Sequence, residues 1–105
     1  MVKAAVRNVP VRAPTVPWTF LSHHGRALVC IARDPDVRLR DIAASLHITE
    51  RRVYDIVNDL SVAGYVIKER DGRRNHYHVQ EHLPLPDDPT LERTVGEVLR
   101  ILMGR

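Results

Sequence analysis

The sequence has very little cysteine and no long apolar run. Cys30 is its single cysteine, so an internal disulfide is impossible and a reducing compartment is favoured. No segment approaches the roughly 18 consecutive apolar residues that a membrane-spanning helix needs. The first residues also lack the continuous apolar stretch of a signal peptide. We therefore predict a cytoplasmic protein that does not enter a membrane.

The sequence also lacks the residue patterns of an enzyme. It has no nucleophile–base pair, no paired-carboxylate motif and no glycine-rich phosphate loop. His76, His78 and His82 could begin a metal site, but two outward histidines on one strand supply only half of the ligands. We expect neither catalysis nor a cofactor, and metal binding by these histidines is left open as a minor hypothesis.

Charge is unevenly distributed along the chain. Sixteen basic and thirteen acidic residues give a net charge of +3. The basic excess lies within residues 1–35 and the acidic excess within residues 81–105. Such asymmetry suits a protein that turns one face toward phosphates. A chain of 105 residues is one domain with one appended element, and so small a core would gain from oligomerisation.

Residues 38–63 predict two short helices joined by a tight turn. Thr49 is suited to cap the second helix, because its hydroxyl can accept hydrogen bonds from backbone N–H groups of the first turn. His47 lies in the turn, where positive φ is often required, and histidine tolerates it better than a β-branched residue. The first helix would turn its apolar residues inward: Leu39, Ile42, Ala43 and Leu46.

The second of these helices is amphipathic. Its inner side would carry Val53, Ile56, Val57, Leu60 and Ala63. Its outer side would carry Arg51, Tyr54, Asp55 and Asn58. An arginine, an aromatic ring and an amide together are suited to base edges in a major groove. The pattern predicts a helix-turn-helix in which residues 49–63 form the recognition helix.

Each residue of the outer side has an expected role toward double-stranded DNA. Arg51 would make a bidentate contact with guanine, Asn58 would pair with adenine, and Tyr54 would meet a thymine methyl group or a phosphate. Asp55 follows Arg51 by one turn and is expected to orient its guanidinium. Phosphate or minor-groove contacts are expected from a further set: Arg38, Arg40, Thr49, Arg52, Arg73 and Arg74.

Residues 65–79 predict a β-hairpin. Residues 65–70 alternate as a strand, residues 71–74 have the turn sequence Asp-Gly-Arg-Arg, and residues 75–79 return with Tyr77 and Val79 toward the core. Gly64 would end the recognition helix in the left-handed region. Two arginines at the tip are typical of a wing that lies over phosphates or in a narrow minor groove. A solvated hairpin tip is the alternative.

Two segments precede the helix-turn-helix. Residues 18–33 predict a first helix, with Ser22 as its N-cap and Asp34-Pro35-Asp36 as its end. Residues 1–17 form a basic arm with three prolines, which oppose a helix. An extended basic arm can enter a minor groove, although a flexible terminus is the simpler interpretation.

The end of the chain predicts a linker and one more helix. Residues 81–88 contain two prolines, and residues 89–105 would form a helix with Asp88 as its N-cap and Pro89 in its first position. The apolar stripe of this helix needs a surface to cover it, and we expect it to pair two subunits. Folding back onto its own domain is the alternative. The expected dimerisation residues are Leu91, Val95, Val98, Leu99 and Leu102.

Residues 21–79 resemble the winged helix-turn-helix of the multiple-antibiotic-resistance and arsenic-repressor classes of bacterial regulators. Thr94-Val95-Gly96-Glu97 is similar to a segment near the end of small actinobacterial members. Residues 51–55 are similar to the Arg-Arg-x-Tyr-Asp motif of eukaryotic cell-cycle winged-helix factors, whose arginines read G·C pairs. The chain departs from the regulators at the turn, where His47 replaces the usual glycine.

The resemblance and the pattern imply a mainly α fold with a small β-hairpin: a winged helix-turn-helix at residues 18–80 with a C-terminal dimerisation helix. Such a protein would be a transcription regulator that binds a pseudo-palindromic operator as a homodimer, under an unidentified small-molecule or protein effector. The alternative is a winged-helix module that binds proteins rather than DNA. That alternative would expose apolar residues on the recognition helix, and the polar outer side disfavours it.

Overall fold

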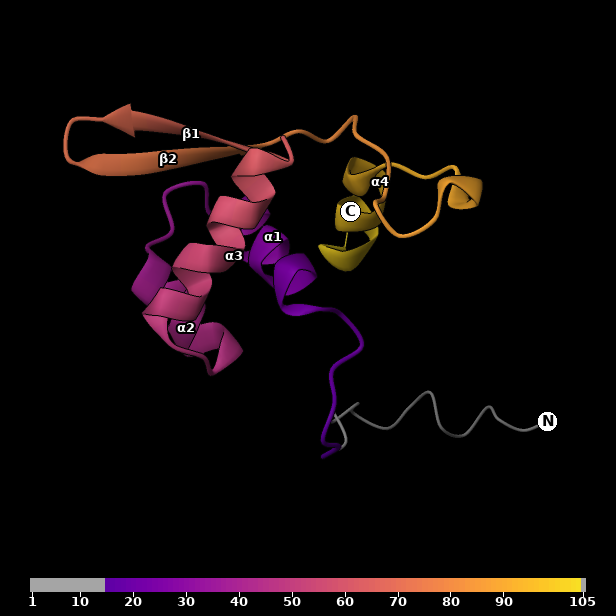
Figure 1. Cartoon of the computed structure of the whole chain (residues 1–105), viewed down its shortest axis with the longest axis horizontal. Coiled ribbons are helices and arrows are strands. Elements are labelled where there is room, and N and C mark those ends of the chain that lie inside the picture. Colours follow the sequence, from indigo (N-terminus) through magenta and orange to yellow (C-terminus); the bar gives the residue numbers. More distant parts are fainter. Residues whose placement is uncertain (1–14, 105) are drawn as a thin grey trace.

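A computed structural model of the chain describes residues 15–104. Within them lie, in order, α1 (His23–Arg33), α2 (Leu39–Leu46), α3 (Glu50–Val62), β1 (Val66–Asp71), β2 (Arg74–Val79), a short 3-10 turn (Pro89–Leu91) and α4 (Val95–Leu102). The hairpin projects from the end of α3, and α4 lies on the other side of α1 (Figure 1). This arrangement is compatible with a winged helix-turn-helix. No helix in this part of the chain is both long enough and apolar enough to cross a membrane. The predicted arm lies outside the described residues except for residues 15–17.

The turn between α2 and α3 follows the sequence prediction closely. His47 adopts the left-handed conformation, with φ of 58° and ψ of 45°, and its N–H donates to the carbonyls of Ala43 and Ala44. The Thr49 hydroxyl accepts from the N–H of Arg52 at 3.1 Å, so it caps α3. Both predictions for this turn are confirmed. The left-handed residue reverses the chain, and the cap satisfies a backbone donor that the helix leaves unpaired.

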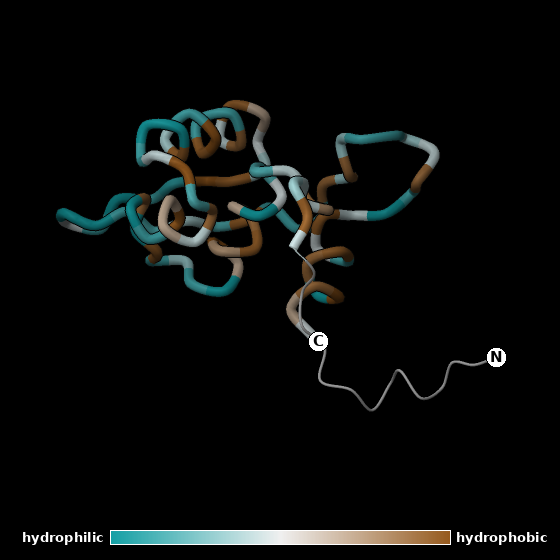
Figure 2. Tube along the Cα trace, turned by 90° about the horizontal axis from the view of Figure 1, so that it is seen from below, coloured by the Kyte–Doolittle hydropathy of each residue, from teal (hydrophilic) through white to brown (hydrophobic). Residues whose placement is uncertain are grey.

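The core contains side chains from all four helices and from the base of the hairpin. The predicted inner side of α3 is buried from Val53 to Leu60, whereas Ala63 is exposed because it follows the last helical residue as its C-cap. Leu39 is half-buried against the core. The apolar parts of the tube converge inside the molecule, and the hairpin tip is hydrophilic (Figure 2). The buried set is Ala27, Leu28, Ile31, Ile42, Ala43, Leu46, Val53, Ile56, Val57, Leu60, Val66, Tyr77, Val95 and Leu99.

The predicted hairpin is confirmed. β1 and β2 pair antiparallel from Val66 opposite Val79 to Asp71 opposite Arg74, and Gly72 in the turn has φ of +64°. Tyr77 is 3% exposed and anchors the strand in the core. Its N–H donates to the carbonyl of Pro35 at 2.9 Å. The α1–α2 connection, residues 34–38, is therefore attached to the outer edge of β2.

The first helix also agrees with its prediction. The Ser22 hydroxyl accepts from the N–H of Gly25, which makes Ser22 the N-cap of α1 as expected. The helix ends at Arg33, directly before Asp34. Cys30 is half-buried and unpaired in the described chain.

The single C-terminal helix predicted for residues 89–105 is wrong in its first part. Asp88 is an N-cap as expected, because its carboxylate accepts from the N–H of Thr90 at 2.8 Å, but only a 3-10 turn follows, and Glu92 then adopts a left-handed conformation with φ of 51°. α4 starts later because Thr94 and Glu97 form a capping box, in which each side chain binds the backbone N–H of the other residue. A stronger helix start therefore lies six residues after the predicted one.

The predicted linker at residues 81–88 is more ordered than its prolines indicate. Pro84 pairs with Thr94 as an isolated antiparallel bridge. The N–H of Val95 donates to Leu83 at 2.8 Å, and the N–H of Gly96 donates to Glu81 at 2.9 Å. These bonds hold the start of α4 against the segment that leaves the hairpin.

Candidate nucleic-acid interface

The outer side of α3 is polar and exposed. The side chain of Arg51 is 82% exposed, and Tyr54 is 53% exposed. Asn58, one turn further along, is exposed as well, and Asp55 is half-exposed. The structure therefore brings all four predicted base-reading residues to one accessible helix face, opposite the side that packs into the core.

Arg51 is the centre of a small cluster on this face. Its Nε lies 3.6 Å from Oδ1 of Asp55, so the expected contact is present. Its guanidinium carbon lies 5.8 Å from the centre of the Tyr54 ring. Contacts to a carboxylate and to an aromatic ring limit the rotamers of a guanidinium. With its side chain 82% exposed, Arg51 keeps N–H donors accessible to a further acceptor.

The wing closes one side of this face. Tyr54 and Asn58 line a groove together with Lys68 of β1 and Asn75 of β2. Lys68 was not among the predicted site residues. Its position in the strand could have indicated it, because Lys68 is paired with Tyr77 and so lies on the hairpin face that turns toward α3. Lys68 adds an exposed positive charge beside the α3 face.

The predicted phosphate-binding arginines form a second group. Arg38 precedes α2, and a hollow beside it is lined also by Arg73 and Arg74 of the wing. The guanidinium of Arg74 donates to the backbone carbonyl of Asp36 at 3.5 Å, whereas Arg73 is exposed at the turn. Arg38 and Arg74 are 36 residues apart in sequence, so the fold is what gathers these charges.

Three further predicted residues lie near the start of α2 and α3. Arg40 and Arg52 are exposed. Thr49 is exposed too, but its hydroxyl oxygen already accepts from the backbone of Arg52. Its hydroxyl hydrogen is the group that could still donate to a phosphate.

The histidines of the hairpin contact carboxylates. Nδ1 of His76 lies 2.6 Å from Oδ1 of Asp36, and Nε2 of His78 lies 2.7 Å from Oε1 of Glu69. The hydrogen bond to Asp36 raises the pKa of His76, and the same bond lowers the pKa of Asp36. His82 is exposed. Residues 15–104 contain no group of three or more His, Cys, Asp or Glu side chains placed to hold a metal ion.

Two of the predicted dimerisation residues are not available to a partner. Val95 is 4% exposed and Leu99 is 5% exposed, because this side of α4 packs on the chain's own core. The prediction is wrong for these two residues, because this side of α4 is folded back onto its own domain. Leu91 and Leu102 are 47% and 37% exposed.

An apolar groove lies beside the exposed part of α4. Leu91, Val98 and Leu102 line it from the C-terminal segment, and Phe20 and Leu21 line it from the segment before α1. Phe20 is 91% exposed. Figure 2 shows the apolar character of α4 next to the C-terminus. We call this surface the apolar groove.

Comparisons with known proteins do not assign the sequence to a family. No family model matches the sequence, and no curated protein is significantly similar to it. The resemblance to bacterial regulators therefore rests on the residues quoted above and stays a prediction.

Proposed function

We propose that the protein is a sequence-specific double-stranded DNA-binding transcription regulator. In this proposal α3 enters the major groove, and the tip of the wing lies on phosphates or in the adjacent minor groove. The observation that carries the proposal is the Arg51 cluster: an exposed guanidinium, in contact with Asp55 and near the Tyr54 ring, on a helix face bordered by the basic wing.

Chemistry favours a base-reading role for this cluster over a general surface role. A planar guanidinium presents two parallel N–H donors, which match the O6 and N7 acceptors of guanine. Asn58 lies on the same face and offers the donor and acceptor that adenine requires. A helix that docks in the groove of another protein would instead present apolar anchors there at i, i+3, i+4 and i+7.

The proposal includes a homodimer. The exposed part of α4 and the apolar groove present Leu91, Val98, Leu102 and Phe20. A second copy that covers this surface would bury apolar area and give the two-fold symmetry that a pseudo-palindromic operator matches. The resemblance to small bacterial regulators is consistent with this arrangement.

Backbone amide NMR would test the interface directly. A mixed-sequence duplex of about 20 base pairs, two turns of DNA, would be added to the isotope-labelled protein at low salt. We expect the largest shift changes at Arg51, Tyr54, Asn58, Lys68 and Arg73, with little change at Arg93. Shift changes confined to α4, or none at saturating DNA, would contradict the proposal and favour a module that binds proteins.

A further inference from the structure

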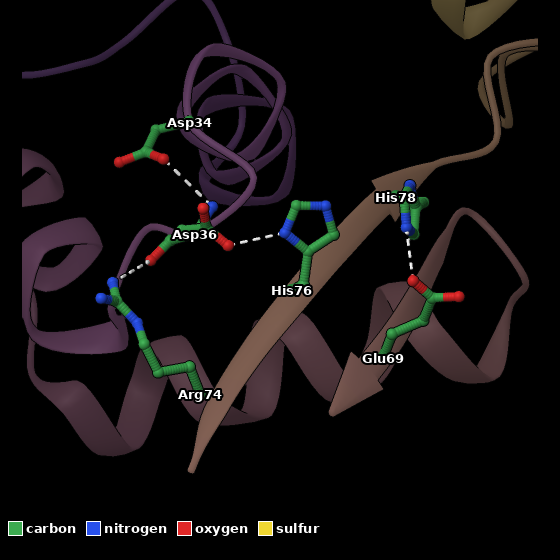
Figure 3. Close-up of polar contacts among 6 residues, drawn as sticks. All are labelled: Asp34, Asp36, Glu69, Arg74, His76 and His78. Carbon is green, nitrogen blue, oxygen red and sulfur yellow. Dashed lines mark hydrogen bonds and ion pairs between the residues drawn. The ribbon is translucent and has the colours of Figure 1, made fainter. Parts of the chain in front are cut away.

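Asp36 joins the wing to the connection between α1 and α2. Its carboxylate contacts the ring of His76, and its backbone carbonyl accepts from Arg74. Both partners belong to β2 and lie two residues apart, so they are on one face of the strand. Figure 3 shows both side chains pointing to Asp36 from the same strand. Asp36 thus holds the half of β2 that leads to the tip.

The connection that carries Asp36 is itself held in place. The Asp34 carboxylate accepts from the N–H of Asp36 at 3.0 Å, and the N–H of Val37 donates to the Asp34 carbonyl at 3.0 Å. Such an Asx-type bond turns the chain locally. The backbone bond from Tyr77 to Pro35 adds an anchor next to it. Because these bonds fix the α1–α2 connection, the Asp36 carboxylate can fix the position of His76, which it binds.

The other histidine of the strand makes a different kind of contact. His78 binds Glu69, and both residues belong to the hairpin (Figure 3). This contact cannot attach the hairpin to the helices. The two pairs therefore have the same chemistry and different mechanical consequences, which makes the His78–Glu69 pair an internal control.

We propose that Asp36 is a positioning residue for the wing, and that its hold on the strand depends on the protonation of His76. The consequence for DNA rests on the proposed function: a held wing keeps Arg73 beside Arg38 for phosphate contact. Asp36 acts through the strand and is not expected to contact DNA itself, because a carboxylate would repel phosphate.

The charges around His76 favour its protonated form. Asp36 faces it from the α1–α2 connection, and Glu69 and Asp71 face it from β1. Arg74 lies two residues before His76 on β2, and the centre of the His78 ring lies 4.8 Å from that of His76 in an edge-on arrangement. The Asp34 carboxylate binds the backbone N–H of Asp36. The hydrogen bond to Asp36 raises the pKa of His76 above its ordinary value. The ion pair is complete below that raised pKa and weakens as the pH rises through it, because the imidazole then loses its charge.

The first experiment needs no DNA. His76 would be titrated by NMR in the wild type and in the Asp36→Asn variant. We expect the variant to lower the pKa of His76, and we expect the amide signals of Gly72 and Arg73 to follow the His76 titration in the wild type only. Identical His76 titrations in the two proteins would overturn the positioning role whatever the protein binds.

The second experiment measures DNA affinity and separates position from charge. Asp36→Asn removes a negative charge, so a purely electrostatic effect would tighten DNA binding. We expect instead that binding at about pH 6, where His76 is charged, weakens roughly two- to fivefold per subunit, the range of an exposed ion pair. Glu69→Gln removes an equal charge from the control pair. It takes away one of the charges that favour protonated His76 but leaves the hydrogen bond from His76 to Asp36, so the affinity at about pH 6 should stay unchanged or become tighter.

The pH profile completes the test. Wild-type affinity should fall as the pH rises through the titration of His76, and His78→Gln should keep that profile. His76→Gln should flatten it. Tighter binding by Asp36→Asn, or an unchanged profile in His76→Gln, would overturn the coupling to DNA. If the wild-type protein does not bind DNA, the proposed function fails. The NMR titration of His76 still decides whether Asp36 positions the wing.

Discussion

On α3, Nε of Arg51 lies 3.6 Å from a carboxylate oxygen of Asp55, one helical turn later. The pair is exposed, so it contributes little to the free energy of unfolding. Its value is geometric, because a guanidinium that contacts one carboxylate still has N–H donors for a second acceptor. This contact supports the first prediction, which concerns base recognition.

Arg51→Ala should weaken binding to the preferred duplex by about 1–3 kcal/mol and leave binding to random duplex nearly unchanged. Fluorescence anisotropy with both duplexes would measure the two affinities. Arg93→Ala is the matched control, because Arg93 pairs with Glu97 at the start of α4, outside the proposed DNA-contacting surface. Equal losses on both duplexes would assign Arg51 to phosphate contact instead.

The wing arginines should act without regard to sequence. Replacing both Arg73 and Arg74 by alanine should weaken all duplexes similarly, and the log–log salt slope should fall by about 0.9 per lost contact, so by nearly two per subunit. Binding isotherms at several salt concentrations would give the slope. An unchanged slope would mean that the wing tip does not meet the DNA backbone.

Two glycines predict opposite effects of one substitution. A Cβ on Gly96 would lie 2.7 Å from Cβ of Glu81, so Gly96→Ala should lower the free energy of unfolding by about 1–3 kcal/mol. A Cβ on Gly25 would lie 3.5 Å from the Ser22 hydroxyl, an ordinary contact in a helix. Gly25→Ala should therefore stabilise the protein by up to about 1 kcal/mol. Thermal unfolding of both variants checks the prediction, and equal shifts would refute the close approach of residues 81 and 96.

The capping box of α4 predicts a pH-dependent stability. The N–H of Thr94 donates to the Glu97 carboxylate and, with Arg93, lowers the pKa of Glu97. A lowered pKa means that the stabilisation is present above the ordinary glutamate pKa and is lost as the pH falls through the folded-state value. Glu97→Gln should therefore lower Tm near neutral pH and have a smaller effect at about pH 3. A difference in Tm that stays constant with pH would show that the ionised carboxylate is not what stabilises the cap.

The dimer prediction rests on the exposed part of α4. Leu102→Glu would bury an unpaired carboxylate if a second copy covers the apolar groove, so this variant should be folded and monomeric and should lose tight operator binding. Ile101 is 75% exposed and does not line the groove, which makes Ile101→Glu the matched control. Light scattering would measure the masses. A monomeric wild type at micromolar concentration, or a Leu102→Glu dimer, would remove α4 from this role.

Local patterns in the sequence were enough to predict the first three helices and the hairpin. Thr49, Ser22 and His47 act through their nearest neighbours along the chain, so their roles were visible in short windows. The C-terminal error was also local. Asp88-Pro89 and Thr94-x-x-Glu97 are competing helix starts, and the capping box carries two reciprocal hydrogen bonds where the first start carries one side-chain cap.

Local sequence patterns could not predict contacts between segments that are distant in sequence. Asp36 and His76 are 40 residues apart, and nothing around either residue indicates the other. Lys68 was missed because its role depends on how the hairpin is turned against α3. Val95 and Leu99 were assigned to a partner because an apolar stripe does not say whether its own domain or another chain will cover it.

Selection of bound sequences from random duplex DNA would show whether α3 of a dimer reads base pairs. We expect an inverted repeat whose half-sites are separated by about 10–10.5 base pairs centre to centre, or a multiple of that distance. Each half-site should contain a G·C pair whose enrichment disappears when the selection is repeated with Arg51→Ala. Recovery of unenriched sequences by a folded wild-type protein, or the same motif from Arg51→Ala, would contradict this role of α3.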